Sequence, residues 1–337
     1  MITAALGLVT PTGVLVYDGP PHTEEWFAVR RSGITATDVP AITGDSRYTT
    51  ARHVYLDKHG ALPDLGQDEN EAALWGTVLE EPVAQVWAQR HAVTVNPVGI
   101  LARVGVRHHL ASLDRLVEVC PDGDGAGVCG LEVKTRSAFV AGSWRDDIPD
   151  DVLAQVLWQL HVTGLPHMHI ACLIGGQRLV EFRVDAAEDA EVIAFVVEQV
   201  ERVWACIERH VMPDVDPTPA LGRLLDALHP DRSGDAVIDA DKAAALVGAY
   251  RDAAAAEKAA VAAKDVARVA LVDAMGAAAR LLADDEDGQR LVATYLPRSR
   301  TTVSAKVLRS DPELWERVTA AGAVTCLLYT SDAADEE

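Results

Sequence analysis

Residues 110–136 read LASLDRLVEVCPDGDGAGVCGLEVKTR, and this stretch decides the fold. Alternating apolar and polar residues on both sides of the segment PDGDGAG predict the two strands of a β-hairpin. Glu132 and Lys134 are two residues apart and therefore project from the same face of their strand, where a neighbouring strand can bring Asp114 beside them. Two carboxylates and an ammonium group on one face predict a hard-cation site with an electrostatic or acid–base partner.

The same spacing also fits an exposed strand face with a surface ion pair, because 51 of the 337 residues are Asp or Glu. Lys134 argues for a specific role. It is the only lysine between Lys58 and Lys242, in a chain whose 30 basic residues are mostly arginines. A compact point charge at this position therefore favours a site over a solvated strand face.

Outward from the hairpin, the periodicity predicts further helices and strands. Helices are expected at residues 24–33, 38–44, 49–60, 69–91, 150–164 and 188–211, and a second hairpin at 167–185 around Gly175-Gly176. This order predicts an α/β (α+β) core with a mixed central sheet flanked by helices.

The domain organisation follows from shifts in composition along the chain. Residues 1–212 are expected to form the core domain, and residues 213–239, rich in Pro, Asp and Gly, a linker. Residues 240–325 are expected to form an extension with an Ala-rich helical part and a small β-hairpin at 288–308. Residues 326–337 begin CLLYTSDAADE, which resembles a translated sequencing adapter, so we expect no function from them.

The composition excludes several classes of protein. No apolar run approaches the length of a membrane span, and the net charge of −21 argues against a general DNA-coating protein. The five scattered cysteines predict a reducing cytoplasm rather than a disulfide framework. Cys120 and Cys129, nine residues apart, are not expected to form a tetrahedral metal site, because no histidine lies nearby in the sequence.

Five sequence blocks, in order, resemble the YqaJ / lambda-exonuclease family of phage-type exonucleases, within the PD-(D/E)XK nuclease superfamily. The blocks together cover about residues 24–185 and are WFAVRRSGITATD (26–38), WGTVLEEPVA (75–84), ASLDRL (111–116), LEVKT (131–135) and AQVLWQLHVTG (154–164). The resemblance implies a restriction-endonuclease-like core. Leu113, Arg115 and Thr37 depart from the family pattern, and the first two place the local backbone in question.

The resemblance also implies roles for individual residues. Catalysis would involve Asp114, Glu132, Lys134 and Gln155, and Mg²⁺ or Mn²⁺ would be held by Glu80, Asp114, Glu132 and the carbonyl of Val133. A 5′-terminal DNA phosphate would be bound by Arg30, Thr37 and Trp26. Glu81 competes with Glu80 for the metal, while Trp158, Gln159 and the pair His108-His109 are expected to be structural.

The activity that the resemblance implies is a Mg²⁺-dependent 5′-to-3′ exonuclease acting on double-stranded DNA ends in phage-type recombination. Its expected partners are a single-strand annealing protein and further copies of the chain in a ring, in the cytoplasm of a bacterial host. Two alternatives stay open: an endonuclease or RecB/Cas4-like repair nuclease of the same fold, and a non-catalytic DNA-end-binding or phage assembly protein. Iron–sulfur members of the RecB/Cas4-like group need four clustered cysteines, whereas the cysteines of this sequence are scattered.

Overall fold

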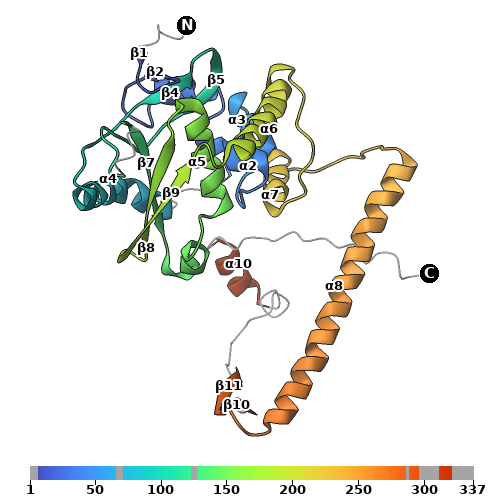
Figure 1. The fold of residues 1–337 in the computed structure, drawn as a ribbon. Helices are drawn as coiled ribbons and strands as arrows, with labels where there is room; N and C mark the ends of the chain where they lie inside the picture. Colours follow the sequence, from blue (N-terminus) through green and yellow to red (C-terminus); the bar gives the residue numbers. More distant parts are fainter. Residues whose placement is uncertain (1–6, 66–70, 123–126, 286–287, 296–310, 321–337) are drawn as a thin grey trace. The chain divides into compact units, whose positions relative to one another are not determined.

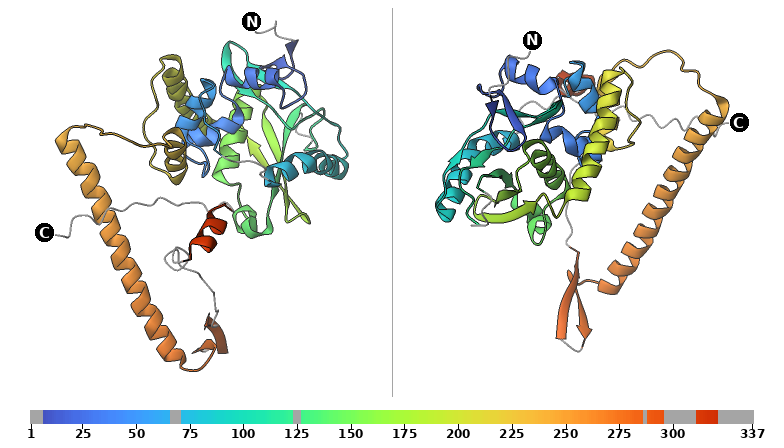
Figure 2. Two further views of the ribbon diagram at one scale, coloured as in Figure 1. Left: turned by 180° about the vertical axis from the view of Figure 1, so that it is seen from behind. Right: turned by 45° about the horizontal axis from the view of Figure 1, so that its top comes forward.

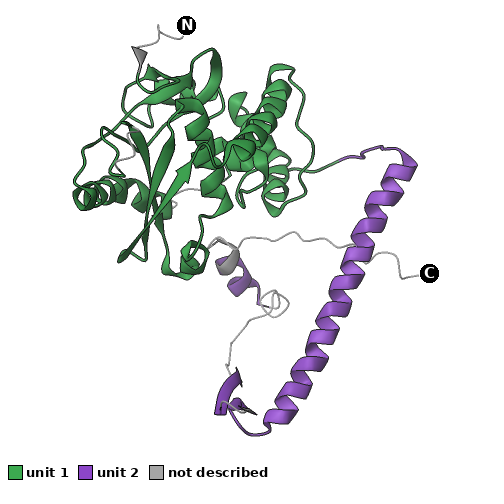
Figure 3. Ribbon diagram, viewed as in Figure 1, with its two compact units in different colours: residues 1–233 green, residues 234–337 purple. Residues whose placement is uncertain are grey.

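The computed structural model describes residues 7–65, 71–122, 127–285, 288–295 and 311–320 (Figure 1). The chain divides into two compact units, Met1–Ser233 and Gly234–Glu337 (Figure 3). All the residues predicted to form the site belong to the first unit. None of the helices in the described part of the chain is long and apolar enough to span a membrane.

The helices predicted for the first unit are present. They are α1 (Glu24–Arg31), α2 (Val39–Thr43), α3 (Ala51–Lys58), α4 (Glu71–His91), α5 (Asp150–Thr163) and α6 (Ala190–Glu208). The unit also contains α7 (Pro219–Leu228), which was not predicted, and the short 3-10 helices η1 (Ala36–Asp38) and η2 (Ala138–Trp144). Local chemistry explains their ends: Thr23 caps α1 through its side chain, and Gly164 ends α5 in the left-handed conformation.

The strands of the first unit form two sheets. The smaller sheet has the order β1-β2-β4-β5 and is antiparallel throughout, with β1 (Gly7–Leu8), β2 (Gly13–Tyr17), β4 (Ile100–Arg103) and β5 (Val106–Ala111). The central sheet has the order β3-β6-β7-β8-β9, with β3 (Val95–Asn96), β6 (Arg115–Val117), β7 (Cys129–Arg136), β8 (His167–Ile174) and β9 (Arg178–Asp185).

The central sheet is mixed because β7 and β8 are parallel, whereas the other neighbouring strands are antiparallel. Parallel neighbours require a crossover, and α5 lies in the segment that connects these two strands. The fold class expected from the sequence, a mixed sheet flanked by helices, is therefore confirmed.

Helices cover both faces of the β7–β8 pair (Figures 1 and 2). On one face, Val83 and Trp87 of α4 belong to the same buried cluster as Leu131 and Val133 of β7. On the other face, α5 and β8 share a second cluster that includes Val156, Leu160, Met168 and Ile170. Because side chains alternate along a strand, the odd-numbered residues of β7 and β8 face α4 and the even-numbered residues face α5.

Two details of the chain course differ from the predictions. The segment 109–119 does not form one strand: it breaks at residues 112–114 and contributes β5 to the smaller sheet and β6 to the central one. In addition, residues 219–228 of the expected linker form α7, whose Leu221 and Leu224 are buried in a core cluster with α2, α3 and α6. These apolar side chains explain why the first compact unit extends to Ser233.

The second unit contains α8 (Ala240–Met275), β10 (Arg280–Asp285), β11 (Gly288–Thr294) and α10 (Pro312–Ala320). The Ala-rich helix is present as predicted, and β11 forms a hairpin with the preceding β10. Residues 296–308, the rest of the hairpin expected at 288–308, lie outside the described residues. Residues 326–337, the adapter-like tail, lie outside the described residues.

Candidate functional site

Strand β7 carries the centre of the predicted site. In the parallel pairing with β8, Glu132 is the partner of Ile170 and Lys134 is the partner of Cys172. Both charged side chains therefore point toward α5, between the apolar side chains of that face. Glu132 is 1% exposed, so its carboxylate has to be hydrogen-bonded within the protein.

The Glu132 carboxylate accepts hydrogen bonds from two glutamines of α5 and from the neighbouring Lys134. Gln155 donates a hydrogen bond to Oε1 of Glu132 at 2.6 Å, and Gln159 donates one to Oε2 at 2.7 Å. Lys134 Nζ donates to the same Oε1 and also to Oε1 of Gln155, the latter at 3.0 Å. The structure thus brings Glu132, Lys134 and Gln155 together, as expected.

Gln159 is a site residue that the sequence analysis missed, because it was expected to be a packing residue. Its amide also donates to the carbonyl of Ser112, at 2.9 Å, and its side chain is fully buried. A signal was available in the sequence: Gln159 follows Gln155 by four residues in a predicted helix, which places both on one helical face.

Asp114 lies in the bend directly before β6, not within a strand as expected. Strand β6 pairs with β7 only from Val117 back to Arg115, which is opposite Leu131, so Val133 lies beyond the end of β6. At this position the Asp114 side chain takes the place of a paired strand, because its Oδ2 accepts a hydrogen bond of 2.7 Å from the amide of Val133. The amide and carbonyl of one strand residue point to the same side, so the Val133 carbonyl faces the edge where Asp114 lies.

Burial and neighbouring charges shift the pKa values of Asp114 and Lys134. Burial, the Glu132 carboxylate and the Glu80 carboxylate raise the pKa of Asp114 well above its usual range, although Lys134 and the Val133 amide act in the opposite direction. Burial alone would lower the pKa of Lys134, but the carboxylates of Glu132 and Asp114 outweigh it, and the net pKa is raised. The site therefore combines a protonated ammonium group with carboxylates that repel one another.

Glu80 reaches the site from α4 and is held by Arg115. The guanidinium of Arg115 donates to Oε1 of Glu80 at 2.7 Å and also to Oε2 of Glu81. Glu81 is the more exposed of the two, with 60% of its side chain accessible against 35% for Glu80. Because only Glu80 contributes to the raised pKa of Asp114, the structure favours Glu80 as the member of the site.

Arg115 also corrects an expectation. Its departure from the family pattern was expected to affect the local backbone more than the chemistry. Instead, its guanidinium bonds Glu80, Glu81 and the carbonyl of Asp114, so it connects the start of β6 to α4.

The predicted phosphate-binding residues form a second cluster, on α1 and η1. Arg30 donates hydrogen bonds to Thr37 at 2.7 Å and to Thr35 at 3.2 Å, and its guanidinium lies 4.5 Å from the centre of the Trp26 ring. Burial lowers the pKa of Arg30 and is only partly offset by Asp38 and Asp57. The structure thus brings Trp26, Arg30 and Thr37 together, with the arginine desolvated and held in one orientation.

The backbone connects the two clusters. Ile34 forms a parallel β-bridge with His109 of β5, and its amide donates to the carbonyl of His108 at 2.7 Å. Because the bridge is parallel, the segments that follow Ile34 and His109 run in the same direction. The first leads to Thr35–Thr37 of the Arg30 cluster, and the second leads to Asp114 of the Glu132 cluster, so both clusters come after the bridge in the direction of the chain.

His108 and His109 belong to a separate network on the other side of this bridge. Their Nε2 atoms lie 3.1 Å and 2.7 Å from Oε1 of Glu201 on α6, and Nδ1 of His109 lies 3.0 Å from Nε2 of His161. Burial, with neighbouring cationic groups, lowers the pKa of His109 and of His161 to about 4. These imidazoles are neutral near pH 7 and connect β5 to α5 and α6.

The inference that Cys120 and Cys129 have no histidine nearby is wrong in three dimensions. His167 and His169 of β8 lie beside both thiols, and all four side chains are buried. The cluster is on the α4 face of the sheet, opposite the face that carries Glu132 and Lys134.

Comparison with known proteins supports the resemblance seen in the sequence. The family model of the YqaJ-like viral recombinase domain matches residues 25–166, which include all the predicted site residues. The protein described as uncharacterized protein YqaJ of Bacillus subtilis (strain 168) is 31% identical over 195 residues, which cover 57% of this chain and 58% of that protein. The chain thus spans less than two thirds of that relative's length.

Among solved structures, the alkaline exonuclease LHK-Exo of Laribacter hongkongensis aligns with a TM-score of 0.45 and 21% identity, covering 56% of this chain and 94% of that one. The same exonuclease in complex with dAMP aligns with a TM-score of 0.45, 20% identity and the same coverage. The match to the family model lies entirely within the first unit, so it is this unit that resembles a YqaJ-like viral recombinase domain.

Proposed function

We propose that this chain is a Mg²⁺-dependent exonuclease that hydrolyses one strand of double-stranded DNA from its 5′ end. The observation that carries the proposal is the convergence of Asp114, Glu132 and Lys134 around Val133, at the point where β6 ends. This convergence lies inside the YqaJ-like domain. The activity of LHK-Exo, an alkaline exonuclease by name, agrees with the proposal but belongs to that protein.

The donor types at the site are the oxygens that a hard divalent cation prefers. Asp114, Glu132 and Glu80 supply carboxylate oxygens, and Val133 supplies a carbonyl at the free edge of β7. Burial, and after it the repulsion from Glu132 and Glu80, raises the pKa of Asp114, and a bound cation would offset both effects by stabilising the charged carboxylate. When bound, Mg²⁺ polarises the scissile phosphate and activates water.

The side chains of the chain itself have distinct tasks in this mechanism. Lys134 places an ammonium group beside Glu132, where it stabilises negative charge that develops on the phosphate in the transition state. Gln155 holds the ammonium group and the carboxylate at once, and so keeps them in one relative orientation. Gln159 fixes the other oxygen of Glu132 from the buried side.

The cluster of Trp26, Arg30 and Thr37 is proposed to bind the 5′-terminal phosphate. An arginine presents paired N–H donors that match phosphate oxygens, and the Thr37 hydroxyl adds a further donor. The contact between Arg30 and Trp26 orients the guanidinium before DNA arrives. Local groups of this kind explain how a chain with a net charge of −21 can act on DNA.

The wider biology is proposed from the family alone. A role in phage-type recombination, a single-strand annealing protein as partner, a ring of several copies and a bacterial cytoplasmic location all agree with a YqaJ-like viral recombinase domain.

One gel assay tests the activity. The full chain is incubated with linear duplex DNA that carries either a 5′-phosphate or a 5′-hydroxyl, and with closed circular DNA, in Mg²⁺ or in EDTA. We expect digestion of linear DNA with Mg²⁺, faster with the 5′-phosphate, and none of the circle. Cleavage of the circle would indicate an endonuclease, and binding to ends without cleavage in Mg²⁺ or Mn²⁺ would indicate a non-catalytic end-binding protein.

A further inference from the structure

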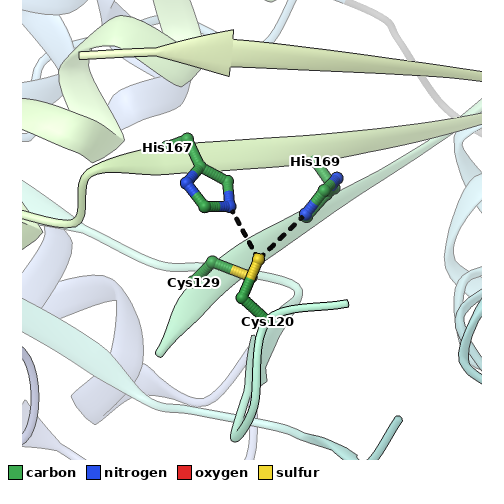
Figure 4. A group of neighbouring side chains, drawn as sticks. All are labelled: Cys120, Cys129, His167 and His169. Carbon is green, nitrogen blue, oxygen red and sulfur yellow. Dashed lines mark hydrogen bonds between the residues drawn. The ribbon is translucent and has the colours of Figure 1, made fainter. Parts of the chain in front are cut away.

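Four potential metal ligands meet beneath α4, away from the proposed nuclease site. Figure 4 shows Cys120, Cys129, His167 and His169 with their side chains pointing toward one another. Their ligand atoms all lie within 4.8 Å of one another, and all four residues are buried. Cys120 Sγ lies 3.1 Å from Nε2 of His167 and 3.9 Å from Nε2 of His169.

The topology of the sheet explains how residues so distant in sequence meet. Strands β7 and β8 are parallel with Gly130 opposite Met168 and Leu131 opposite His169, so Cys129 lies near His167 on the same face. Cys120 follows β6, and its amide donates to the carbonyl of Gly127 at 2.8 Å, which turns the chain back toward β7. Three separate segments thus each contribute ligands.

The spacing of the ligand atoms is within a few tenths of an ångström of that in a tetrahedral zinc centre. With Zn–S distances of about 2.3 Å and Zn–N distances of about 2.0–2.1 Å, two ligands on one zinc ion lie about 3.3–3.8 Å apart. The two sulfur–nitrogen distances at Cys120 lie on either side of that range. A shift of a few tenths of an ångström, which side-chain rotation can supply, would bring both into it.

We propose that Cys120, Cys129, His167 and His169 bind a structural Zn²⁺ ion. Two thiolates and two imidazoles form a soft, four-coordinate donor set, which selects zinc over Mg²⁺ and leaves no open position for substrate. The proposal is independent of the proposed nuclease activity, because it uses none of the residues of that site. It adds a second metal, of different chemistry and different purpose.

The surroundings of the cluster are those of a structural metal site. The ring of His169 packs against Trp87 of α4, with the ring centres 5.1 Å apart, so the site is closed on the helix side. Asp122 lies 3.7 Å from Nε2 of His169 and is itself ion-paired with Arg183 of β9. Asp122 approaches the same ring nitrogen that faces Cys120, so its carboxylate places a negative charge beside the proposed cation and does not bond the other nitrogen of His169.

The ion would stabilise the strand that carries the proposed catalytic residues. Cys129 is three residues before Glu132 on β7, and the two side chains project from opposite faces of the sheet. Zinc would tie the start of β7 to β8 and to the segment after β6, and β6 itself begins next to Asp114. The expected effect of zinc is therefore on stability, with an indirect effect on the geometry around Glu132.

The described residues hold another close group of His, Cys, Asp or Glu side chains outside the proposed nuclease site, His108, His109 and Glu201, and it is the weaker zinc candidate. Its carboxylate is 46% exposed and already accepts contacts from both imidazoles through one oxygen. It serves as an internal control, because it also contains two histidines.

The test is a zinc measurement on the full chain. The protein is purified from zinc-supplemented medium, exchanged into metal-free buffer and analysed by metal mass spectrometry. We expect one zinc ion per chain in the wild type and in the Cys206→Ser and His108→Ala variants, and a loss of more than about tenfold in zinc affinity in Cys120→Ser and His167→Gln. A thiol reagent should release the zinc, and a strong chelator should lower the Tm of the wild type.

Cobalt substitution makes the test independent of whether the variants fold. Co²⁺ added to wild-type protein should give the intense visible bands of a tetrahedral centre and a sulfur-to-cobalt charge-transfer band. The proposal is overturned if the protein lacks zinc and all five cysteines titrate as free thiols, or if Cys120 and Cys129 form a disulfide. Loss of zinc in His108→Ala, with retention in Cys120→Ser, would also overturn it.

Discussion

Gln159 donates a hydrogen bond of 2.7 Å to Oε2 of Glu132, while Gln155 and Lys134 both donate to Oε1. The two oxygens of one buried carboxylate are thus held from two sides. A carboxylate fixed in this way cannot rotate when a cation or a phosphate approaches, which is what a metal ligand in a nuclease site requires.

Gln159→Leu should therefore weaken the site. Leucine has a similar volume but no donor, so Oε2 of Glu132 and the carbonyl of Ser112 lose their partner inside the protein. We expect the free energy of unfolding to fall by about 1–3 kcal/mol, and the Mg²⁺ concentration for half-maximal activity to rise about 10–100-fold. Chemical denaturation and Mg²⁺ titration of the nuclease rate measure both.

Gln85→Leu is the matched control for this change. Gln85 also bonds a glutamate from a helix, but both groups are exposed, so its loss should change stability by less than about 0.5 kcal/mol. Wild-type stability and Mg²⁺ dependence in Gln159→Leu would show that Gln159 only fills space.

Lys134→Ala should abolish cleavage while leaving the fold intact. Glu132 keeps its two glutamine donors, so the carboxylate stays satisfied, but the positive charge beside the scissile phosphate is lost. We expect the rate of digestion to fall by about 10²–10⁴-fold with near-normal DNA binding. Single-turnover digestion and a filter-binding assay separate the two effects.

The Lys134→Arg variant tests whether the positive charge alone is sufficient for cleavage. The guanidinium preserves the charge but is planar and bulkier than the ammonium group, so we expect a large loss here as well. Substantial digestion by Lys134→Ala would remove this lysine from the mechanism.

Asp114→Asn should raise stability while it removes activity. Burial and the repulsion between Asp114 and Glu132 disfavour the charged form, and asparagine keeps an oxygen that can accept from the Val133 amide. In EDTA we expect the Tm to rise by about 2–4 °C, which corresponds to about 1 kcal/mol in a domain of this size. Added Mg²⁺ should stabilise the wild type and leave the variant unchanged.

Thermal denaturation monitored by circular dichroism, with and without Mg²⁺, provides the measurement for Asp114→Asn. A lower Tm than the wild type in EDTA would show that the carboxylate contributes more to stability through its hydrogen bond than it costs through repulsion.

Arg30→Ala should slow digestion of duplex DNA with a 5′-phosphate far more than digestion of duplex DNA with a 5′-hydroxyl. In this variant the 5′-phosphate loses the paired N–H donors of the guanidinium, whereas a 5′-hydroxyl has no charged oxygens that those donors would bind. We expect the ratio of the two rates to fall by about tenfold or more, since a charge-assisted hydrogen bond is worth about 1.5–3 kcal/mol. Initial rates on the two substrates give the ratio directly.

Arg31→Ala is the neighbouring control. The Arg31 side chain is 47% exposed and lies 3.6 Å from Asp57, outside the Trp26 cluster, so the ratio should stay as in the wild type. Equal slowing on both substrates by Arg30→Ala would make Arg30 a general backbone contact or a structural residue.

Local patterns in the sequence were sufficient for much of the fold. The two-residue period around Glu132 and Lys134, and the helix with Gln155 near its middle, predicted which side chains share a face, because these periods depend on the backbone alone. The Ala-rich helix of the second unit was predicted from propensity in the same way.

Other features could not be predicted because they depend on which distant segments pair. The break at residues 112–114 arises because β5 and β6 join different sheets, and nothing local to 109–119 contains that information. Arg115 looked like a backbone substitution until α4 placed Glu80 and Glu81 within its reach. Similarly, α7 is a helix in a linker-like composition that becomes part of the core once α3 and α6 offer an apolar surface.

The sequence by itself determined the mixed α/β class and the shared face of Glu132 and Lys134, because residues two apart on a strand share a face whatever else the chain does. That Gln155 joins Asp114, Glu132 and Lys134 was implied by the family resemblance. Only the tertiary structure decided that His167 and His169 lie beside Cys120 and Cys129. The histidines are 38 or more residues from either cysteine in the sequence. The parallel register of β7 and β8 brings them to Cys129, and the turn after β6 brings Cys120 to the same place. Such a register is set by the crossover through α5 and by packing on both faces of the sheet, which no short stretch of residues encodes.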